Sequence, residues 1–81
     1  MPHIIVKLYS GRSEEQKINL ADNITKVVSE NLNLDESSIS IAIEEVSREN
    51  WAKEVYKKDI IDKREKLYKE PGYRPKENEF E

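Results

Sequence analysis

The sequence predicts an α/β (α+β) fold, with one βαβ unit followed by a second, C-terminal helix. Two short segments, residues 3–9 and 38–46, alternate apolar and polar residues as β-strands do. The segment between them carries apolar residues at helical spacing instead. Strands joined through a helix should be parallel, because only a parallel pair needs so long a connection. We therefore expect a two-stranded parallel sheet with a helix packed against it.

The first strand, residues 3–9, leads into the first helix. Gly11 interrupts the alternation just after the strand, and Ser13 followed by Gln16 has the spacing of a capping box. A helix of roughly five turns should therefore begin near Ser13. The apolar face of the strand consists of Ile4, Val6 and Leu8, and the apolar stripe of the helix consists of Ile18, Ala21, Ile24, Val27, Val28 and Leu32.

The remaining elements follow from composition and spacing. The polar segment 31–38 predicts a loop, and the isoleucines after it place the second strand at about 38–46. Apolar residues at helical spacing predict a second helix over about 49–69, which Pro71-Gly72 should end. Its solvated face should be supported by the i, i+4 ion pairs Asp59–Lys63 and Asp62–Lys66.

A chain this small should be one domain, over residues 1–73. Residues 74–81 form a polar tail that we expect to be flexible unless Phe80 docks somewhere. With 81 residues and no cysteine, the chain can bury only a small core and has no disulfide to support it. Two strands do not make a stable sheet alone. We expect a C2 homodimer with a four-stranded sheet, and such dimers could assemble further.

Composition excludes several classes of function. The net charge of −3, with charges of both signs, gives no basic surface for nucleic acid. No apolar stretch is long enough to span a membrane or act as a signal peptide, so we expect a soluble cytoplasmic protein. His3 is the only histidine and cysteine is absent, so a zinc site is not expected.

Pro2 directly follows the initiator methionine, which is usually removed before a small second residue. Removal would leave a secondary amine whose direction is fixed by the proline ring. An α-amino group has a pKa of about 7.7–8.0, and burial or a nearby cation would lower it. Pro2 is therefore a candidate general base, although a proline that merely starts an edge strand would look the same.

The chain resembles the 4-oxalocrotonate tautomerase family over nearly its whole length, to about Tyr73. The start of the chain carries the resemblance: Met-Pro, a short strand and Gly11-Arg12-Ser13-Glu14-Glu15-Gln16-Lys17. Later segments are more similar to the branch of small dimeric bacterial tautomerases tested on phenylpyruvate-type substrates. These segments are Ser37-Ser38-Ile39-Ser40-Ile41-Ala42-Ile43, Trp51 and Lys69-Glu70-Pro71-Gly72-Tyr73.

The resemblance implies a cofactor-free proton shift between the enol and keto forms of a small carboxylate substrate. Pro2 would be the base, and Arg12 would bind the carboxylate or steady the enolate oxygen. Trp51 matches the position of an aromatic wall beside the proline. Ser40 stands where the hexameric family member has a second arginine, which puts a dicarboxylate substrate in doubt. Ser40 either donates a hydrogen bond to the substrate or is a strand residue facing a wet cleft.

Two alternatives accompany this interpretation. Relatives of the same family hydrate or dehalogenate unsaturated acids with a protonated proline, and a pH–rate profile would separate the two reactions. A non-catalytic dimerisation or partner-binding module is also consistent with the chain, above all if Met1 stays attached to Pro2. His3 would point to the face opposite Pro2, so we interpret it as a surface or interface residue.

Overall fold

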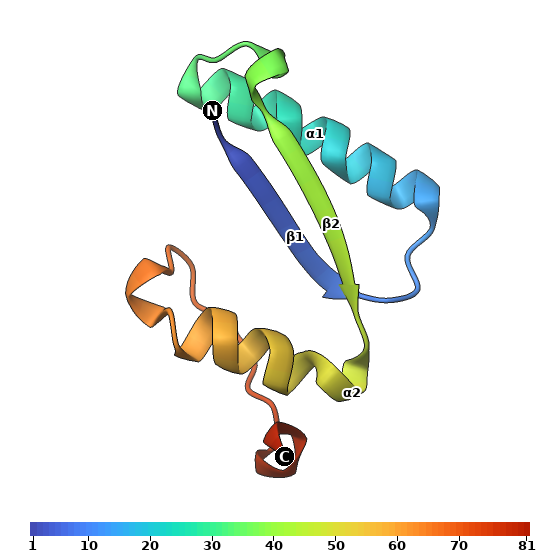
Figure 1. Cartoon of the computed structure of the whole chain (residues 1–81), viewed down its shortest axis with the longest axis vertical. Coiled ribbons are helices and arrows are strands. Elements are labelled where there is room, and N and C mark those ends of the chain that lie inside the picture. Colours follow the sequence, from blue (N-terminus) through green and yellow to red (C-terminus); the bar gives the residue numbers. More distant parts are fainter. The chain divides into compact units, whose positions relative to one another are not determined.

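The computed structural model describes all residues, 1–81, and divides into two compact units, residues 1–45 and 46–81. Figure 1 labels the two strands and the two α-helices. The first unit is built from strand β1 (His3–Tyr9), helix α1 (Glu14–Leu32) and strand β2 (Ser40–Val46), whose last residue opens the second unit. The second unit continues with the short helix α2 (Arg48–Trp51) and the turns after it.

Strands β1 and β2 pair as parallel neighbours in a two-stranded sheet, as the sequence predicts (Figure 1). Helix α1 lies against one face of this sheet. Leu8 of β1 lines a pocket together with Leu20 of α1, and Ile43 of β2 lines another together with Ile18 of α1. The apolar side of each strand therefore faces the helix, and the predicted βαβ unit is confirmed.

Helix α1 begins and ends through local hydrogen bonds that its own sequence supplies. The Ser13 hydroxyl accepts from the Gln16 backbone N–H at 3.1 Å, and the Gln16 side chain accepts from the Ser13 N–H at 3.1 Å. This is the predicted capping box, which satisfies two of the unpaired donors at the helix start. At the other end Asn33 adopts a left-handed conformation, φ 54°, and its N–H bonds to the Ser29 carbonyl.

The predicted loop 31–38 is shorter than expected. Helix α1 includes its first two residues, and a 3₁₀ turn occupies Glu36–Ser38. The Asp35 carboxylate accepts from the hydroxyl and the backbone N–H of Ser37, which closes this turn and holds the pKa of Asp35 below its usual value. Because the turn uses Ser38, strand β2 begins at Ser40 and not at residue 38.

Replacing Ser13 with alanine is expected to lower the free energy of unfolding by about 1 kcal/mol, because the cap of the longest helix is lost. Urea denaturation followed by circular dichroism, at one fixed protein concentration, measures the change. Ser10→Ala is the matched control, since Ser10 is an exposed serine outside the cap. Equal midpoints for the two variants would contradict a stabilising role for the cap.

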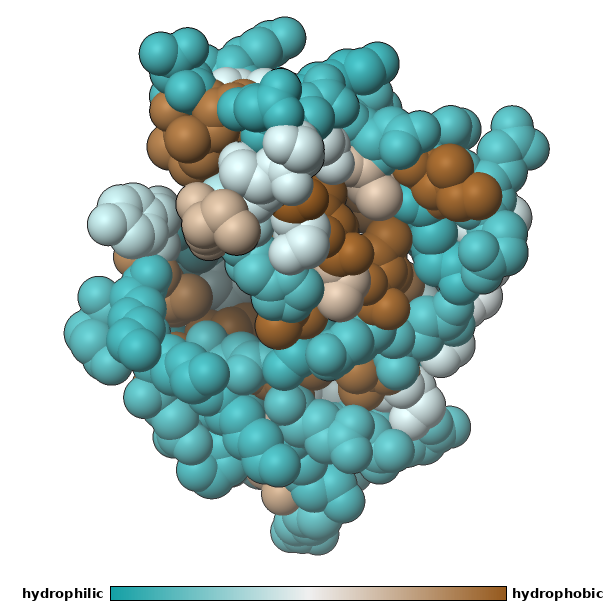
Figure 2. Space-filling view, turned by 45° about the horizontal axis from the view of Figure 1, so that its top comes forward, coloured by the Kyte–Doolittle hydropathy of each residue, from teal (hydrophilic) through white to brown (hydrophobic).

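The first unit has no fully buried side chain on either strand or on α1. Several large apolar residues of the helix are more than half exposed: Ile18 at 56%, Val27 at 56% and Leu32 at 57%. Figure 2 shows apolar side chains lying open among polar ones on the face that it displays. A sheet of two strands with so little burial gains little from the hydrophobic effect.

The second helix differs from the prediction in length and kind. After α2, residues Ala52–Ile61 form a π-helix. The helix predicted over residues 49–69 does not continue past this segment, so the prediction is wrong for the residues that follow Ile61. In a π-helix residues five apart share a face, so the Asp62 N–H bonds to the Lys57 carbonyl at 2.8 Å and the two side chains pair at 3.1 Å. Asp62 therefore does not pair with Lys66, whereas the expected pair Asp59–Lys63 is present at 3.6 Å.

The helix also ends about ten residues before Pro71-Gly72, which the sequence suggested as its stop. Lys63 leaves the helical conformation, with φ −123°, and Arg64–Lys66 form only a short 3₁₀ turn. The buried core of the second unit lies on the π-helix and consists of Ala52, Val55 and Tyr56, with exposures of 2%, 6% and 3%.

The C-terminal segment packs against this core. Its last turn, Glu77–Phe80, is a 3₁₀ turn, and the ring of Phe80 lies 6.0 Å from that of Tyr56 in an edge-on arrangement. The guanidinium of Arg74 lies 5.7 Å from the centre of the Phe80 ring. The sequence predicted a flexible tail unless Phe80 docks somewhere. In the structure the Phe80 ring contacts Tyr56.

Candidate active site

Pro2 lies immediately before β1 and is half-buried. Its carbonyl accepts a hydrogen bond of 3.2 Å from the backbone N–H of Ser40, at the start of β2. The ring fixes one backbone dihedral of Pro2, and this bond ties the residue to the neighbouring strand. The nitrogen of Pro2 therefore has a well-defined position at one end of the sheet.

Ser40 and His3 form a side-chain pair next to Pro2. The Ser40 hydroxyl lies 2.7 Å from Nδ1 of His3, although the two residues are 37 positions apart in sequence. Sequence reasoning interpreted His3 as a surface residue and missed this contact. The signal was present, since both residues begin parallel strands that we expected to be neighbours, and alternation puts both on the face away from α1.

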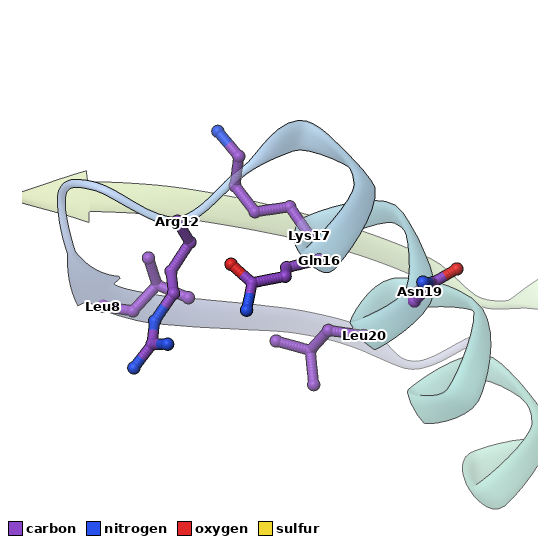
Figure 3. A pocket seen from close by; sticks show the side chains of 6 residues that line it. All are labelled: Leu8, Arg12, Gln16, Lys17, Asn19 and Leu20. Atoms are coloured by element: carbon purple, nitrogen blue, oxygen red, sulfur yellow. The ribbon is translucent and has the colours of Figure 1, made fainter.

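Arg12 lies at the other end of β1, in the turn that leads into α1. Gly11 makes this turn with φ +117°, a conformation that favours glycine. A pocket of about 360 Å³ opens there. Its lining residues, shown in Figure 3, are Leu8, Arg12, Gln16, Lys17, Asn19 and Leu20. The pocket thus offers two cations and two amide side chains beside an apolar surface, which suits a small carboxylic acid with a hydrocarbon part.

The two cations of this pocket differ in how their charge is compensated. Lys17 is paired with Glu14 at 2.8 Å and with Glu45 of β2, and these carboxylates raise its pKa above the ordinary value. No carboxylate of the chain pairs with Arg12. In Figure 3 the two side chains extend in opposite directions from the ribbon. Arg12 is therefore the cation of this pocket whose charge no carboxylate of the chain compensates.

Pro2 and Arg12 are not close to each other within one chain. They lie at opposite ends of β1, and a strand of seven residues spans roughly 20 Å. Figure 1 shows the N-terminus at one end of β1 and the turn into α1 at the other. The sequence argument treated Pro2 and Arg12 as partners without noting that the strand between them keeps them apart.

Trp51 ends α2 in the second unit and is half-buried. Its indole Nε1–H donates a hydrogen bond of 2.7 Å to the hydroxyl of Tyr73. The sequence analysis used Tyr73 only as part of the resemblance to the family and did not connect it with Trp51. No group of three or more His, Asp or Glu side chains is arranged to hold a metal ion, and no helix has the length and apolar character that a membrane crossing requires.

Comparison with known proteins places the chain in a family. The sequence profile described as "Tautomerase enzyme" matches residues 2–59. The chain belongs to this tautomerase family. The match begins at Pro2 and contains Arg12, Ser40 and Trp51, the four residues that the sequence analysis selected. Membership confirms the expectation of an enzyme of the isomerase class.

Two relatives support the branch named in the sequence analysis. A probable tautomerase of Xylella fastidiosa (strain 9a5c) is 45% identical over 73 residues, 90% of this chain and 89% of the relative. Tautomerase PptA of Cronobacter sakazakii (strain ATCC BAA-894) is 40% identical over 74 residues, 90% of this chain and 97% of the relative. The tautomerase family and its PptA-like branch were therefore correctly recognised.

Solved structures support the fold. YwhB, a homologue of 4-oxalocrotonate tautomerase, is 38% identical with a TM-score of 0.58, over 59% of this chain and 79% of YwhB. A protein studied for trans-3-chloroacrylic acid dehalogenase activity is 33% identical with a TM-score of 0.59, over 60% of this chain and 92% of that one. Both similarities support the tautomerase-like βαβ fold of the chain.

Proposed function

We propose that the protein is a cofactor-independent cytoplasmic tautomerase that interconverts the enol and keto forms of a small 2-oxo acid. Pro2, freed from Met1, is the general base. The observation that carries this proposal is the family match that begins at Pro2, the residue held at the start of β1 by the Ser40 N–H. A rigidly placed amine with a pKa near neutral is suited to moving one proton.

The reaction needs only a proton shift. In ketonisation the neutral amine takes the enol O–H proton, the C–O bond becomes a carbonyl, and the protonated amine delivers a proton to the adjacent carbon. The negative charge that develops on the oxygen, or the substrate carboxylate, requires a cation. Arg12 suits this role because its guanidinium presents a fixed fork of donors and has no carboxylate partner in the chain.

We propose further that each site is completed by a second copy of the chain. One edge of β1 is not paired within the chain, because the sheet contains only β1 and β2. Two copies that pair antiparallel along this edge would place the end of one β1 beside the start of the other. Arg12 of one copy would then approach Pro2 of the other, which the roughly 20 Å length of β1 prevents within one chain.

Ser40 and Trp51 are two further residues that we propose to act on the substrate. Ser40 is bonded to the Pro2 carbonyl through its backbone N–H, and its hydroxyl shares a hydrogen bond with His3. The hydroxyl would donate to the substrate or steady the strand that carries the base. Trp51 would supply a flat apolar surface for a planar substrate, phenylpyruvate-like in preference to a dicarboxylate. A chain with one uncompensated arginine in its pocket favours one carboxylate per substrate.

The assay is ketonisation of phenylenolpyruvate, followed by ultraviolet absorbance on untagged protein whose N-terminal Pro2 is verified by mass. We expect kcat/KM to fall about tenfold per pH unit below the pKa of the amine, because only the neutral amine accepts a proton. A rate that stays constant on acidification would contradict Pro2 as the base.

Hydration or dehalogenation of a small unsaturated acid is the second candidate, and the similarity to the protein with dehalogenase activity favours it. In that reaction the proline acts while protonated, so the rate should fall as the pH rises through its pKa. Halide release from 3-chloroacrylic acid, measured beside ketonisation, separates the two candidates.

A further inference from the structure

The structure connects Trp51 to the C-terminal segment, which lies outside the family match over residues 2–59. We propose that Tyr73 is a positioning residue that holds the indole of Trp51 in one orientation and thereby sets the preference of the enzyme for planar aromatic substrates. This inference rests on the proposed role of Trp51 as a substrate-binding surface.

The contact between the two residues is short and directional. The indole Nε1–H of Trp51 can act only as a donor, and it donates to the Tyr73 hydroxyl at 2.7 Å. Trp51 is the last residue of α2, directly before the π-helix begins at Ala52. The backbone places the indole at this junction, and the hydroxyl of Tyr73 restricts its rotation about the side-chain bonds.

Tyr73 is itself fixed from the buried side. The hydroxyl of Tyr56 donates to the Tyr73 carbonyl at 3.1 Å, and the two rings meet edge-to-face with centres 5.3 Å apart. Tyr56 is only 3% exposed, and its ring also contacts Phe80. The contacts therefore run from the core of the second unit through Tyr73 to Trp51, with the last turn of the chain closing over the same core.

The role of the Tyr73 hydroxyl can be tested by a substitution that removes a single oxygen atom. Tyr73 is 47% exposed, so Tyr73→Phe removes a hydroxyl from the surface and leaves the ring contact with Tyr56 in place. Tyr68→Phe is the matched control, since Tyr68 is fully exposed and makes no ring contact. The two variants differ from the native chain by one oxygen each.

The first measurement is the local motion of the indole. Trp51 is the only tryptophan, so fluorescence excited beyond the tyrosine absorption reports on this side chain alone. We expect time-resolved anisotropy to show a larger fast component in Tyr73→Phe than in the native chain, and no change in Tyr68→Phe. Equal anisotropy in all three proteins would overturn the positioning role.

The second measurement is kinetic. We expect Tyr73→Phe to raise KM for an aromatic enol about three- to tenfold, the effect of one hydrogen bond, with kcat within about twofold. KM for an aliphatic 2-oxo acid should be unchanged, because such a substrate gains little from an aromatic surface. Equal changes for both substrates would overturn the specificity role.

A failure of the underlying function is distinguishable from a failure of this inference. If Trp51→Ala leaves KM for the aromatic enol at the native value, then Trp51 does not contact the substrate and the specificity role of Tyr73 falls with it. The anisotropy measurement requires no activity, so it decides separately whether Tyr73 positions the indole.

Discussion

Replacing Pro2 with alanine is expected to lower kcat/KM for enol ketonisation by about 10²–10⁴-fold, the usual contribution of a general base. Alanine keeps an amine at the N-terminus, but this amine is primary. It also lacks the ring that fixes the direction of the proline nitrogen. Because Pro2 is tied to β2 only through its carbonyl, the alanine amine can rotate away from the substrate. The ultraviolet ketonisation assay measures the loss.

A form of the chain that keeps Met1 is the matched control for this prediction. It contains every side chain of the active protein, but the nitrogen of Pro2 is an amide and cannot accept a proton. We expect it to lose at least as much activity as Pro2→Ala. Full activity in the Met1-bearing form would rule out the Pro2 amine as the base, whatever the alanine variant does.

Replacing Arg12 with glutamine is expected to lower kcat/KM about 10²–10³-fold, because the developing negative charge loses its cation. Arg12→Lys should recover part of the rate, since it restores the charge but not the planar fork. Lys17→Gln is the control within the same pocket. Its charge is already compensated by Glu14 and Glu45, so we expect a smaller effect on kcat/KM.

The Arg12→Gln variant, mixed with the Pro2→Ala variant, tests whether a site is shared between two copies of the chain. Pro2→Ala and Arg12→Gln chains are unfolded together in equal amounts and refolded. Random pairing makes half of the dimers mixed, and each mixed dimer has one site with native Pro2 and native Arg12, so about a quarter of the native activity should return. No recovery would mean that Pro2 and Arg12 act from the same chain.

Local signals in the sequence were enough to predict the first unit. The Ser13–Gln16 spacing fixed where α1 begins, and alternation around Ile41 and Ile43 identified β2 as a strand that faces the helix. Both are properties of a few neighbouring residues, and the hydrogen bonds that form the cap are equally local. The position of Pro2 at the start of β1 followed in the same way.

The second unit was harder to predict because its structure depends on longer-range contacts. Apolar spacing over a short segment cannot distinguish an α-helix from a π-helix, so the Lys57–Asp62 pair was not foreseen. The bond between Trp51 and Tyr73 spans 22 positions. The separation of Pro2 and Arg12, in contrast, could have been calculated from the length of the predicted strand.

The absence of a fully buried side chain in the first unit has a consequence for how the protein behaves at different concentrations. If two copies pair through β1 as proposed, most of the burial that stabilises this unit comes from association. Folding and assembly are then one equilibrium governed by mass action, and each tenfold dilution of the chain weakens the folded dimer by about 1.4 kcal/mol. The abundance of the protein would in this way set the fraction of chains that possess a working site.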